Sequence, residues 1–199
     1  MAAERNAGRT KAAILRAAED LFARRGFDRT SLQQIGETAG VARSTPAYFF
    51  KTKQQLYDAV LKKALERGQA AIRPAFEAAL TAPSPEDALD TFVADVLAFL
   101  AHDKNFVLIM QREALAPQAS LTALLSGAAL AKARTAFTHS LGHEDPDHFF
   151  IELSALTWFP FAHDNTLVAA LGFDARDPAF LRRHRERIVR LFTQPRESA

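Results

Sequence analysis

The stretch that decides the fold is residues 27–61, FDRTSLQQIGETAGVARSTPAYFFKTKQQLYDAVL. Ser31 followed by Gln34, or Thr30 followed by Gln33, has the spacing of a capping box, in which two side chains satisfy backbone N–H groups at the start of a helix. Gly36 is small enough to let two helices cross closely, and Gly40 can adopt the positive φ of a tight turn. A second short helix follows this turn. The spacing therefore predicts a helix-turn-helix unit.

The sequence on both sides of this stretch also predicts helices. Apolar residues at spacings of three and four predict a helix over residues 10–25, which ends at Gly26. Thr52 with Gln55 repeats the capping-box pattern and opens a long helix that runs to the region of Pro74. Further helices are expected from Pro85 onward, over residues 103–115, over 118–141, over 147–171 with an interruption at Pro160, and from Asp177 to Phe192. No segment has the alternation of a strand, so we expect an all-α protein of about nine helices.

Charge is distributed unevenly along the chain. Residues 1–68 carry 13 Lys and Arg against 7 Asp and Glu, a net charge of +6, whereas residues 69–199 carry 12 against 16, a net charge of −4. This asymmetry indicates a polyanionic partner for the basic segment. The absence of Cys excludes disulfides and thiol catalysis. Because the N-terminus lacks an apolar signal segment and no apolar run is long enough to span a bilayer, we expect a cytoplasmic protein without a membrane partner.

Residues 27–61, together with the preceding AAEDLFARRGF of residues 17–27, resemble the N-terminal DNA-binding domain of the tetracycline-repressor (TetR) family of bacterial transcriptional regulators. The helix caps, the turn and the segment YFFKTK of residues 48–53 are in register with that domain. The resemblance implies a three-helix helix-turn-helix domain in residues 1–52 and a helical effector-binding and dimerisation domain in residues 53–199. It also implies a homodimeric repressor that binds a palindromic operator in double-stranded DNA and is released by a small-molecule effector, expected to be apolar or aromatic.

The expected DNA contacts follow from this resemblance. The helix from Arg43 to Phe49 would enter a major groove with its N-terminal residues toward the base edges. Arg43 can donate two hydrogen bonds to guanine, a contact worth about 1–3 kcal/mol of discrimination. Pro46 and Ala47 depart from the residues common at these positions of the family, which affects the details of base contact rather than the fold. The expected DNA-binding residues are Thr30, Arg43, Ser44, Thr45, Tyr48, Lys51 and Lys53; taken singly, each charge among them could equally be solvated surface.

The C-terminal part of the chain is rich in aromatic residues. Buried aromatic side chains are the ordinary filling of helical domains, so most of them should belong to the core. Trp offers a large face with one hydrogen-bond donor and Met adapts to varied shapes, so both suit the wall of a ligand pocket. With the family resemblance, the expected effector-binding residues are Phe99, His102, Phe106, Met110, Trp158 and Phe161.

Two helices near the C-terminus carry apolar stripes that could pair across a dimer. The family resemblance implies a four-helix interface made by two helices of each subunit. Packing within one monomer is the alternative for the same stripes. The expected interface residues are Phe149, Leu153, Leu156, Leu181, His184, Ile188 and Leu191. The arginines beside the last stripe fit a solvated face or dimer-edge salt bridges better than a second nucleic-acid site.

Two other functions remain as alternatives. In the first, the helix-turn-helix protein has a body that only dimerises and binds no effector. In the second, which is much weaker, a helical metal-binding enzyme uses the cluster of His139, His143, Glu144, Asp145, Asp147 and His148. Because Gly142 and Pro146 make that stretch a helix end and a loop, we expect polar surface there rather than a metal site. The sequence also lacks a phosphate-binding Gly-rich loop and a nucleophile elbow, so we expect no cofactor and no enzymatic activity.

Overall fold

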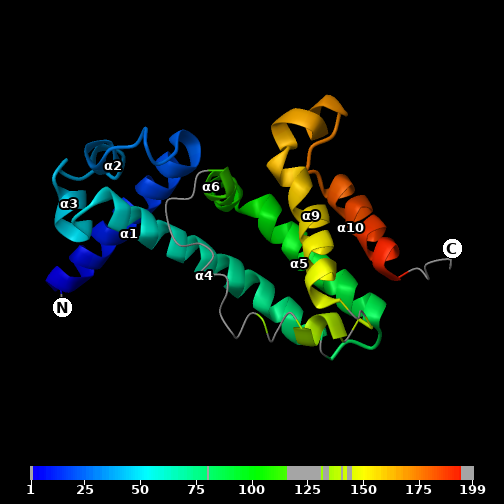
Figure 1. Cartoon of the computed structure of the whole chain (residues 1–199). Coiled ribbons are helices and arrows are strands. Elements are labelled where there is room, and N and C mark those ends of the chain that lie inside the picture. Colours follow the sequence, from blue (N-terminus) through cyan, green and yellow to red (C-terminus); the bar gives the residue numbers. More distant parts are fainter. Residues whose placement is uncertain are drawn as a thin grey trace. The chain divides into compact units, whose positions relative to one another are not determined.

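The computed structural model describes residues 2–79, 81–115, 131, 135–139, 141–142 and 145–193, and the regular structure of these residues is helical, without strands (Figure 1). The expected all-α class is therefore confirmed. Spatial contacts divide the chain into two compact units. The N-terminal unit comprises residues 1–66 with the described part of 105–124, and the C-terminal unit comprises residues 67–104 with the described part of 125–199. The expected domain boundary after residue 52 thus lies inside the N-terminal unit.

The N-terminal unit contains α1 (Ala2–Arg25), α2 (Leu32–Thr38), α3 (Thr45–Phe50), the first part of α4 (Lys53–Ala79) and most of α6 (Lys104–Leu115). These helices share one hydrophobic core, and burial of each large apolar side chain contributes about 1.5–3 kcal/mol. The fully buried members of this core include Ile14, Phe22, Ile35, Leu56, Leu61 and Ile109. The start of α4 belongs to this unit because its apolar side chains fill the space between the other helices.

The local structure of the helix-turn-helix agrees with the sequence pattern. Ser31 Oγ accepts a hydrogen bond from Gln34 N at 3.2 Å, and Gln34 Oε1 accepts one from Ser31 N at 2.9 Å, which completes the capping box of α2. Gly40 has a φ of +69°, as the turn requires. A Cβ atom at Gly36 would lie 3.0 Å from the carbonyl oxygen of Ala42, so α2 and the chain entering α3 approach closely.

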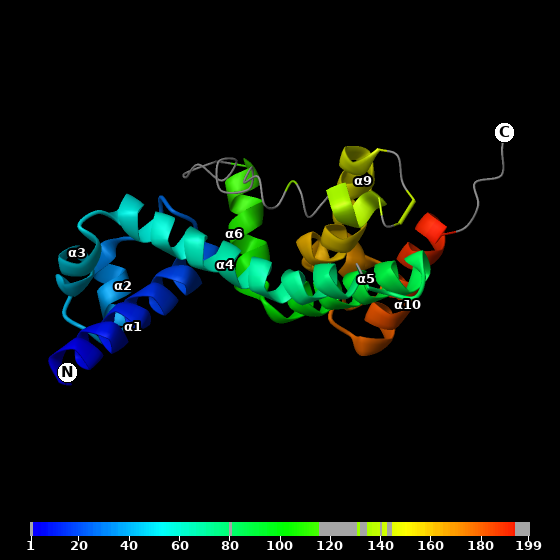
Figure 2. The same ribbon diagram turned by 90° about the horizontal axis from the view of Figure 1, so that it is seen from below.

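The C-terminal unit contains the rest of α4, α5 (Pro85–His102), α9 (Pro146–Ala162), a π-helical segment η1 (Asp164–Val168) and α10 (Pro178–Thr193). Helix α5 packs against both α9 and α10, as both views show (Figures 1 and 2). Phe137 lies at the centre of an aromatic cluster, with ring centroids 4.5 Å from Phe92 and 5.2 Å from Phe76. Among the described residues, no helix is both long and apolar enough to cross a membrane.

Two expectations based on proline are wrong. Helix α4 continues through Pro74 to Ala79, and α9 continues through Pro160 to Ala162, where the π-helical segment follows. A proline inside a helix removes one backbone hydrogen bond and bends the helix, but tertiary packing can offset that cost. Pro160 is buried, which is consistent with such packing. The helix expected over residues 118–141 lies mostly outside the described residues, although residues 135–139 are helical.

Candidate nucleic-acid interface

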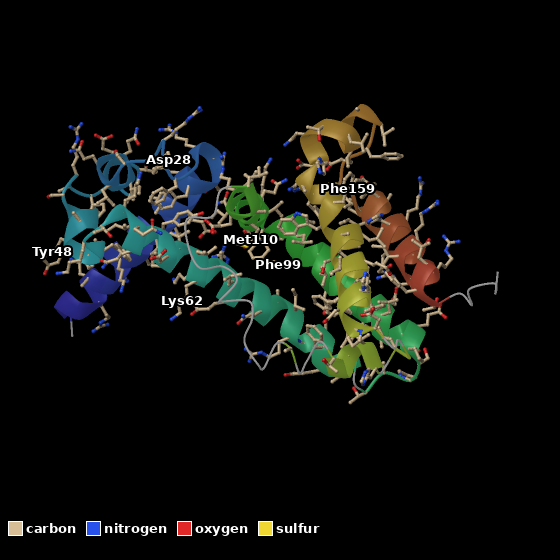
Figure 3. The ribbon with its side chains drawn as sticks, in the orientation of Figure 1. Asp28, Tyr48, Lys62, Phe99, Met110 and Phe159 are labelled. Carbon is tan, nitrogen blue, oxygen red and sulfur yellow. The ribbon has the colours of Figure 1, made fainter. Side chains whose placement is uncertain are left out.

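Helix α3 is anchored on one side and exposed on the other. Pro46 and Phe50, four residues apart, are buried against the rest of the N-terminal unit. This spacing leaves Ala47, Tyr48 and Lys51 on the opposite side, and the Tyr48 side chain is 81% exposed. Figure 3 shows Tyr48 projecting outward from α3. A large aromatic side chain that projects into solvent from a short helix is available for contact with a partner.

Arg43 lies in the turn just before α3, since this helix begins at Thr45 and not at Arg43 as expected. The Arg43 Nε atom is 2.6 Å from the Glu37 carboxylate at the end of α2, and both side chains are largely exposed. The ion pair holds the guanidinium beside the N-terminal end of α3. Ser44 is exposed and makes no capping hydrogen bond, and Thr45 is half-buried.

Lys51, which follows α3, has an unusual backbone conformation. Its φ of +61° lies in a region that residues with a side chain rarely adopt, at a cost of about 1–3 kcal/mol. Its backbone N–H donates to the Ala47 carbonyl oxygen at 2.9 Å, and its side chain is exposed. The next residue, Thr52, accepts a hydrogen bond from Gln55 N at 3.1 Å and caps α4, as the sequence predicted. The strained residue therefore joins the exposed α3 to the start of α4.

Two of the expected DNA-binding residues have structural contacts inside the unit. Thr30 is 2% exposed, and its hydroxyl donates to the Gly26 carbonyl oxygen at 2.8 Å. The Lys53 ammonium donates to the Phe27 carbonyl oxygen at 3.0 Å and lies 4.2 Å from the centroid of the Phe27 ring. We correct the expected interface accordingly: these side chains stabilise the turn between α1 and α2, so we leave them out of the proposed DNA-binding surface.

Sequence reasoning missed the partner of Arg43. Glu37 lies six positions earlier, in α2, whereas Arg43 lies in the turn that follows, and no periodicity relates the two residues. It also missed the position of Lys11, whose ammonium lies 5.6 Å from the ring centroid of Phe50 and so places α1 beside α3. Both contacts depend on how the helices pack, which their own sequences do not specify.

The six residues expected to bind an effector are divided between the two units. Phe106 and Met110 are half-buried and pack against the core of the N-terminal unit. The C-terminal unit holds Phe99, His102, Trp158 and Phe161. Of these, Phe161 is buried, and the Arg176 guanidinium lies 5.9 Å from its ring centroid. Three cavities that the described residues form are lined by other residues, so the effector site stays a prediction.

The residues expected at a dimer interface differ from one another in how exposed they are. Phe149, Leu153 and Ile188 are buried within the chain itself, so they offer no area to a second subunit and that part of the expectation is corrected. Leu156, Leu181 and His184 are half-buried, and His184 Nε2 lies 2.9 Å from the Leu156 carbonyl oxygen; Leu191 is exposed. Three of the seven residues thus pack within one monomer, which is the alternative for these stripes, and the dimer interface stays a prediction.

The polar cluster near the start of α9 has a structural role in its described part. Asp145 caps α9 by accepting a hydrogen bond from His148 N at 3.0 Å, and this bond lowers the pKa of Asp145. Two members of the expected cluster, His143 and Glu144, lie outside the described residues. Among the residues that are described, no group of three potential metal ligands comes together.

A helix-turn-helix with an exposed second helix, in a segment of high positive charge, defines a class of DNA-binding proteins. Residues 14–60 match the family model described as bacterial regulatory proteins, tetR family. Over 56 residues the chain is 48% identical to the HTH-type transcriptional regulator RutR of Escherichia coli K12, a match that covers 28% of this chain and 26% of RutR. The N-terminal module is therefore similar to the DNA-binding module of TetR-family regulators.

Solved structures share the fold over nearly the whole chain. One, assigned to the TetR family of transcriptional regulators, is from Mesorhizobium loti; it has a TM-score of 0.69 and 21% identity, and the match covers 93% of this chain and 95% of that one. Another, described as a transcriptional regulator from Streptomyces coelicolor, has a TM-score of 0.68 and 23% identity, with 94% and 99% of the two chains covered. At these identities the likeness concerns the fold alone. The match to RutR spans about a quarter of that relative.

Proposed function

We propose that the protein is a transcriptional regulator that binds an operator in double-stranded DNA through α3 and the turn before it. The observation that carries the proposal is that the matched residues 14–60 include α3, whose outward side presents Tyr48 to solvent, and the exposed Lys51 that directly follows it. Arg43 and Ser44 lie exposed at the start of the same surface. The net charge of +6 on residues 1–68 supplies long-range attraction to DNA. This role places the protein in the bacterial cytoplasm.

The proposed regulator acts as a homodimer on a palindromic operator. Exposed apolar side chains in the C-terminal unit support a protein partner there. Ile151, Ala155 and Phe159 lie on one side of α9 at spacings of four residues, and Ile151 is 65% exposed. Leu191 of α10 is exposed as well. A two-fold symmetric pair of such surfaces would place two copies of α3 on half-sites about one DNA turn, or a multiple of it, apart.

Repression and release by a small apolar or aromatic effector complete the proposal. Binding of the effector would favour a conformation of the dimer in which the two recognition helices no longer match the half-site spacing. The alternative is a body that dimerises without an effector. A thermal-shift screen of apolar and aromatic compounds separates the two, because a compound that binds the folded protein raises its unfolding temperature. A hit must also lower DNA binding to count as an effector.

The operator is tested by selecting sequences from random double-stranded DNA with the full-length protein. Enrichment of a palindrome is expected from a symmetric dimer. Recovery of no enriched sequence would disprove the operator. Enrichment of a single unpaired half-site would contradict the dimeric mode while leaving the helix-turn-helix contact in place.

The first prediction concerns base recognition by Arg43. Arg43→Ala should weaken binding to the selected operator by about 1–3 kcal/mol, because a bidentate contact to guanine is lost, and should change binding to unrelated DNA much less. Arg16→Ala is the matched control, since Arg16 is exposed on α1 and precedes the helix-turn-helix. Fluorescence anisotropy on both DNA types measures the effect. Equal losses on the two DNAs would instead make Arg43 a phosphate contact.

A further inference from the structure

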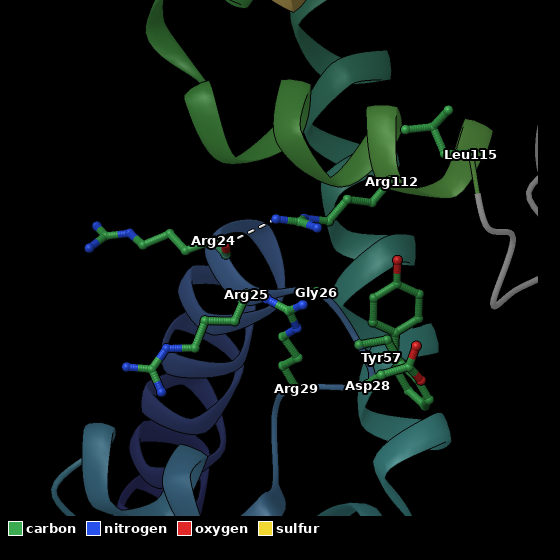
Figure 4. A pocket seen from close by; sticks show the side chains of 9 residues that line it. Arg24, Arg25, Gly26, Asp28, Arg29, Tyr57, Arg112 and Leu115 are labelled. Carbon is green, nitrogen blue, oxygen red and sulfur yellow. Dashed lines mark hydrogen bonds between the residues drawn. The ribbon is translucent and has the colours of Figure 1, made fainter. Parts of the chain in front are cut away.

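The N-terminal unit contains a cavity of about 670 Å³ at the C-terminal end of α1. Its walls come from the end of α1, the turn that follows, α4 and the end of α6 (Figure 4). This volume lies within the range of about 300–1,000 Å³ that is typical of small-molecule sites. The lining residues are Arg24, Arg25, Gly26, Phe27, Asp28, Arg29, Tyr57, Arg112 and Leu115.

Positive charge dominates this cavity. Four arginines line it against one carboxylate, that of Asp28. None of the ion pairs in the described part of the chain involves any of these five residues. In Figure 4 the side chains of Arg29 and Arg112 point toward each other beside Gly26, whereas Arg24 and Arg25 extend away. Two guanidinium groups that converge without a carboxylate between them repel each other, and an anion placed there would relieve the repulsion.

Arg112 is fixed in place while part of its hydrogen-bonding capacity stays available. Its Nε donates to the Ala23 carbonyl oxygen and its Nη2 to the Arg24 carbonyl oxygen, both at 2.9 Å. A guanidinium has five N–H donors, so these two bonds leave donors on Nη1 and Nη2 for a ligand. Gly26 leaves room for this group, since a Cβ at Gly26 would lie 3.2 Å from Arg112 Nη1. The site is therefore preorganised around one arginine.

The other wall of the cavity is apolar. Phe27 and Tyr57 pack edge to face with ring centroids 5.2 Å apart, and Leu115 forms an exposed lip, with 87% of its surface accessible. The planar guanidinium group of arginine can donate two parallel hydrogen bonds to the oxygens of a phosphate or a carboxylate. The combination of guanidinium groups with ring edges and a leucine suits an oxyanion that carries an organic substituent.

The cavity is separate from the proposed DNA-reading surface. The contact of Lys11 with Phe50 places α3 beside the first half of α1, whereas Arg24 and Arg25 lie at its other end. At 1.5 Å per residue, the two positions are roughly 20 Å apart along the helix.

We propose that this cavity binds a small organic oxyanion with at least two negative charges, such as an organic diphosphate. Arg29 and Arg112 hold the charged group between them, and the rings and Leu115 contact its substituent. The site shares no lining residue with the expected apolar effector site, and its existence does not depend on the proposed regulation of transcription.

The test is isothermal titration calorimetry of the full chain with inorganic pyrophosphate as the probe. Saturable binding of one pyrophosphate per chain is expected, and it should be weaker for inorganic phosphate. Arg29→Gln should weaken pyrophosphate binding about tenfold or more, because a charge-assisted hydrogen bond is lost. Asp28→Asn should tighten binding several-fold, because the one carboxylate lining the site is neutralised. Arg16→Gln, which removes an exposed charge of α1 outside the cavity, should leave binding unchanged.

Opposite signs for the two cavity variants are the decisive result. Arg29 and Asp28 are exposed, so both variants should fold, and their thermal unfolding verifies this. The proposal is overturned by the absence of saturable binding at millimolar pyrophosphate, or by equal effects of all three variants. It is also overturned if Arg29→Gln lowers affinity for DNA but not for pyrophosphate, since the arginines would then contact the DNA backbone.

Discussion

Tyr57 and Glu113 form a buried hydrogen bond that joins α4 to α6. The Tyr57 hydroxyl donates to Glu113 Oε1 at 2.7 Å, and the Glu113 side chain is 1% exposed. Burial, followed by the hydrogen bond to the carboxylate, raises the pKa of Tyr57 well above its ordinary value. The phenol therefore stays protonated and remains a donor throughout the neutral range. A buried carboxylate that lost this donor would carry the cost of its own desolvation.

This contact leads to a stability prediction. Tyr57→Phe should lower the free energy of unfolding by about 1–3 kcal/mol, since the ring packing is kept while a buried carboxylate loses a hydrogen bond. Urea denaturation followed by circular dichroism measures the change. Tyr48→Phe removes the same hydroxyl from an exposed side chain and should change stability by less than about 0.5 kcal/mol. Similar losses in the two variants would show that the buried bond contributes nothing specific.

Single residues also show where sequence reasoning stops. Arg43, Ser44, Tyr48 and Lys51 were predicted at the start and on the outer side of the recognition helix, and the structure leaves all four exposed or largely exposed. Thr30 was predicted to lie near DNA from its place before α2, but its hydroxyl is used within the turn. A position in a motif specifies the backbone, whereas the direction of a side chain depends on neighbours from other helices.

At the scale of elements, two serines stand at the N-cap positions of the two helices of the helix-turn-helix. Ser31 caps α2 through the reciprocal bonds with Gln34. Ser44 occupies the same position before α3 but makes no side-chain capping bond. Comparing the two serines therefore separates the stabilisation that the capping hydrogen bonds provide from the general effect of replacing a serine.

The resulting prediction is that Ser31→Ala costs about 1 kcal/mol of stability, because a backbone N–H at the start of α2 loses its acceptor. Ser44→Ala should cost only a few tenths of a kcal/mol at most, since it removes no cap. Thermal unfolding of the two variants measures both effects under the same conditions. A loss for Ser44→Ala as large as that for Ser31→Ala would contradict the assignment of the cap.

The elements that the sequence predicted best are those with local determinants. Gly26, which has a φ of +83°, marks the C-terminal end of α1 and the capping box marks the start of α2, because the effect of these residues is confined to one turn of chain; the start of α1 at Ala2 lies eight residues before the expected one. The two helix-interior prolines were misjudged because the local sequence does not show whether packing offsets the cost of a bend; in the structure Pro160 is buried, whereas Pro74 is exposed. For the same reason, periodicity located the apolar stripes of α9 and α10 without showing that α5 of the same chain covers part of them.

At the scale of the whole molecule, positive charge is concentrated in the N-terminal part of the chain. Residues 1–68 hold a net charge of +6, while α10, in the rest of the chain, carries a row of arginines. One of them, Arg185, pairs with Asp90 of α5 at 3.0 Å, so part of that row has a role within the C-terminal unit. This arrangement supports DNA binding by the N-terminal segment rather than by α10.

The salt dependence of DNA binding tests this division. Binding should weaken steeply with salt, because bound phosphates release counterions. Lys51→Ala should reduce the slope of log K against log salt by about one, as expected for one lost phosphate contact. Arg187→Ala, on the exposed side of α10, should leave the slope unchanged. Anisotropy titrations at several salt concentrations supply the slopes, and a reduced slope for Arg187→Ala would assign α10 to the DNA interface.

Gly36 has a consequence for how this protein tolerates mutation. Every other amino acid has a Cβ atom. At this position the Cβ would lie 3.0 Å from the Ala42 carbonyl oxygen and 3.1 Å from Arg43 Cα, and both of these are backbone atoms. Backbone atoms cannot move away by a change of rotamer, as a flexible side chain can. Even alanine at this position would therefore force α2 and the start of α3 apart. Arg43 would move with that displacement. A single methyl group at Gly36 would thus change the direction of the side chain that we propose reads the bases.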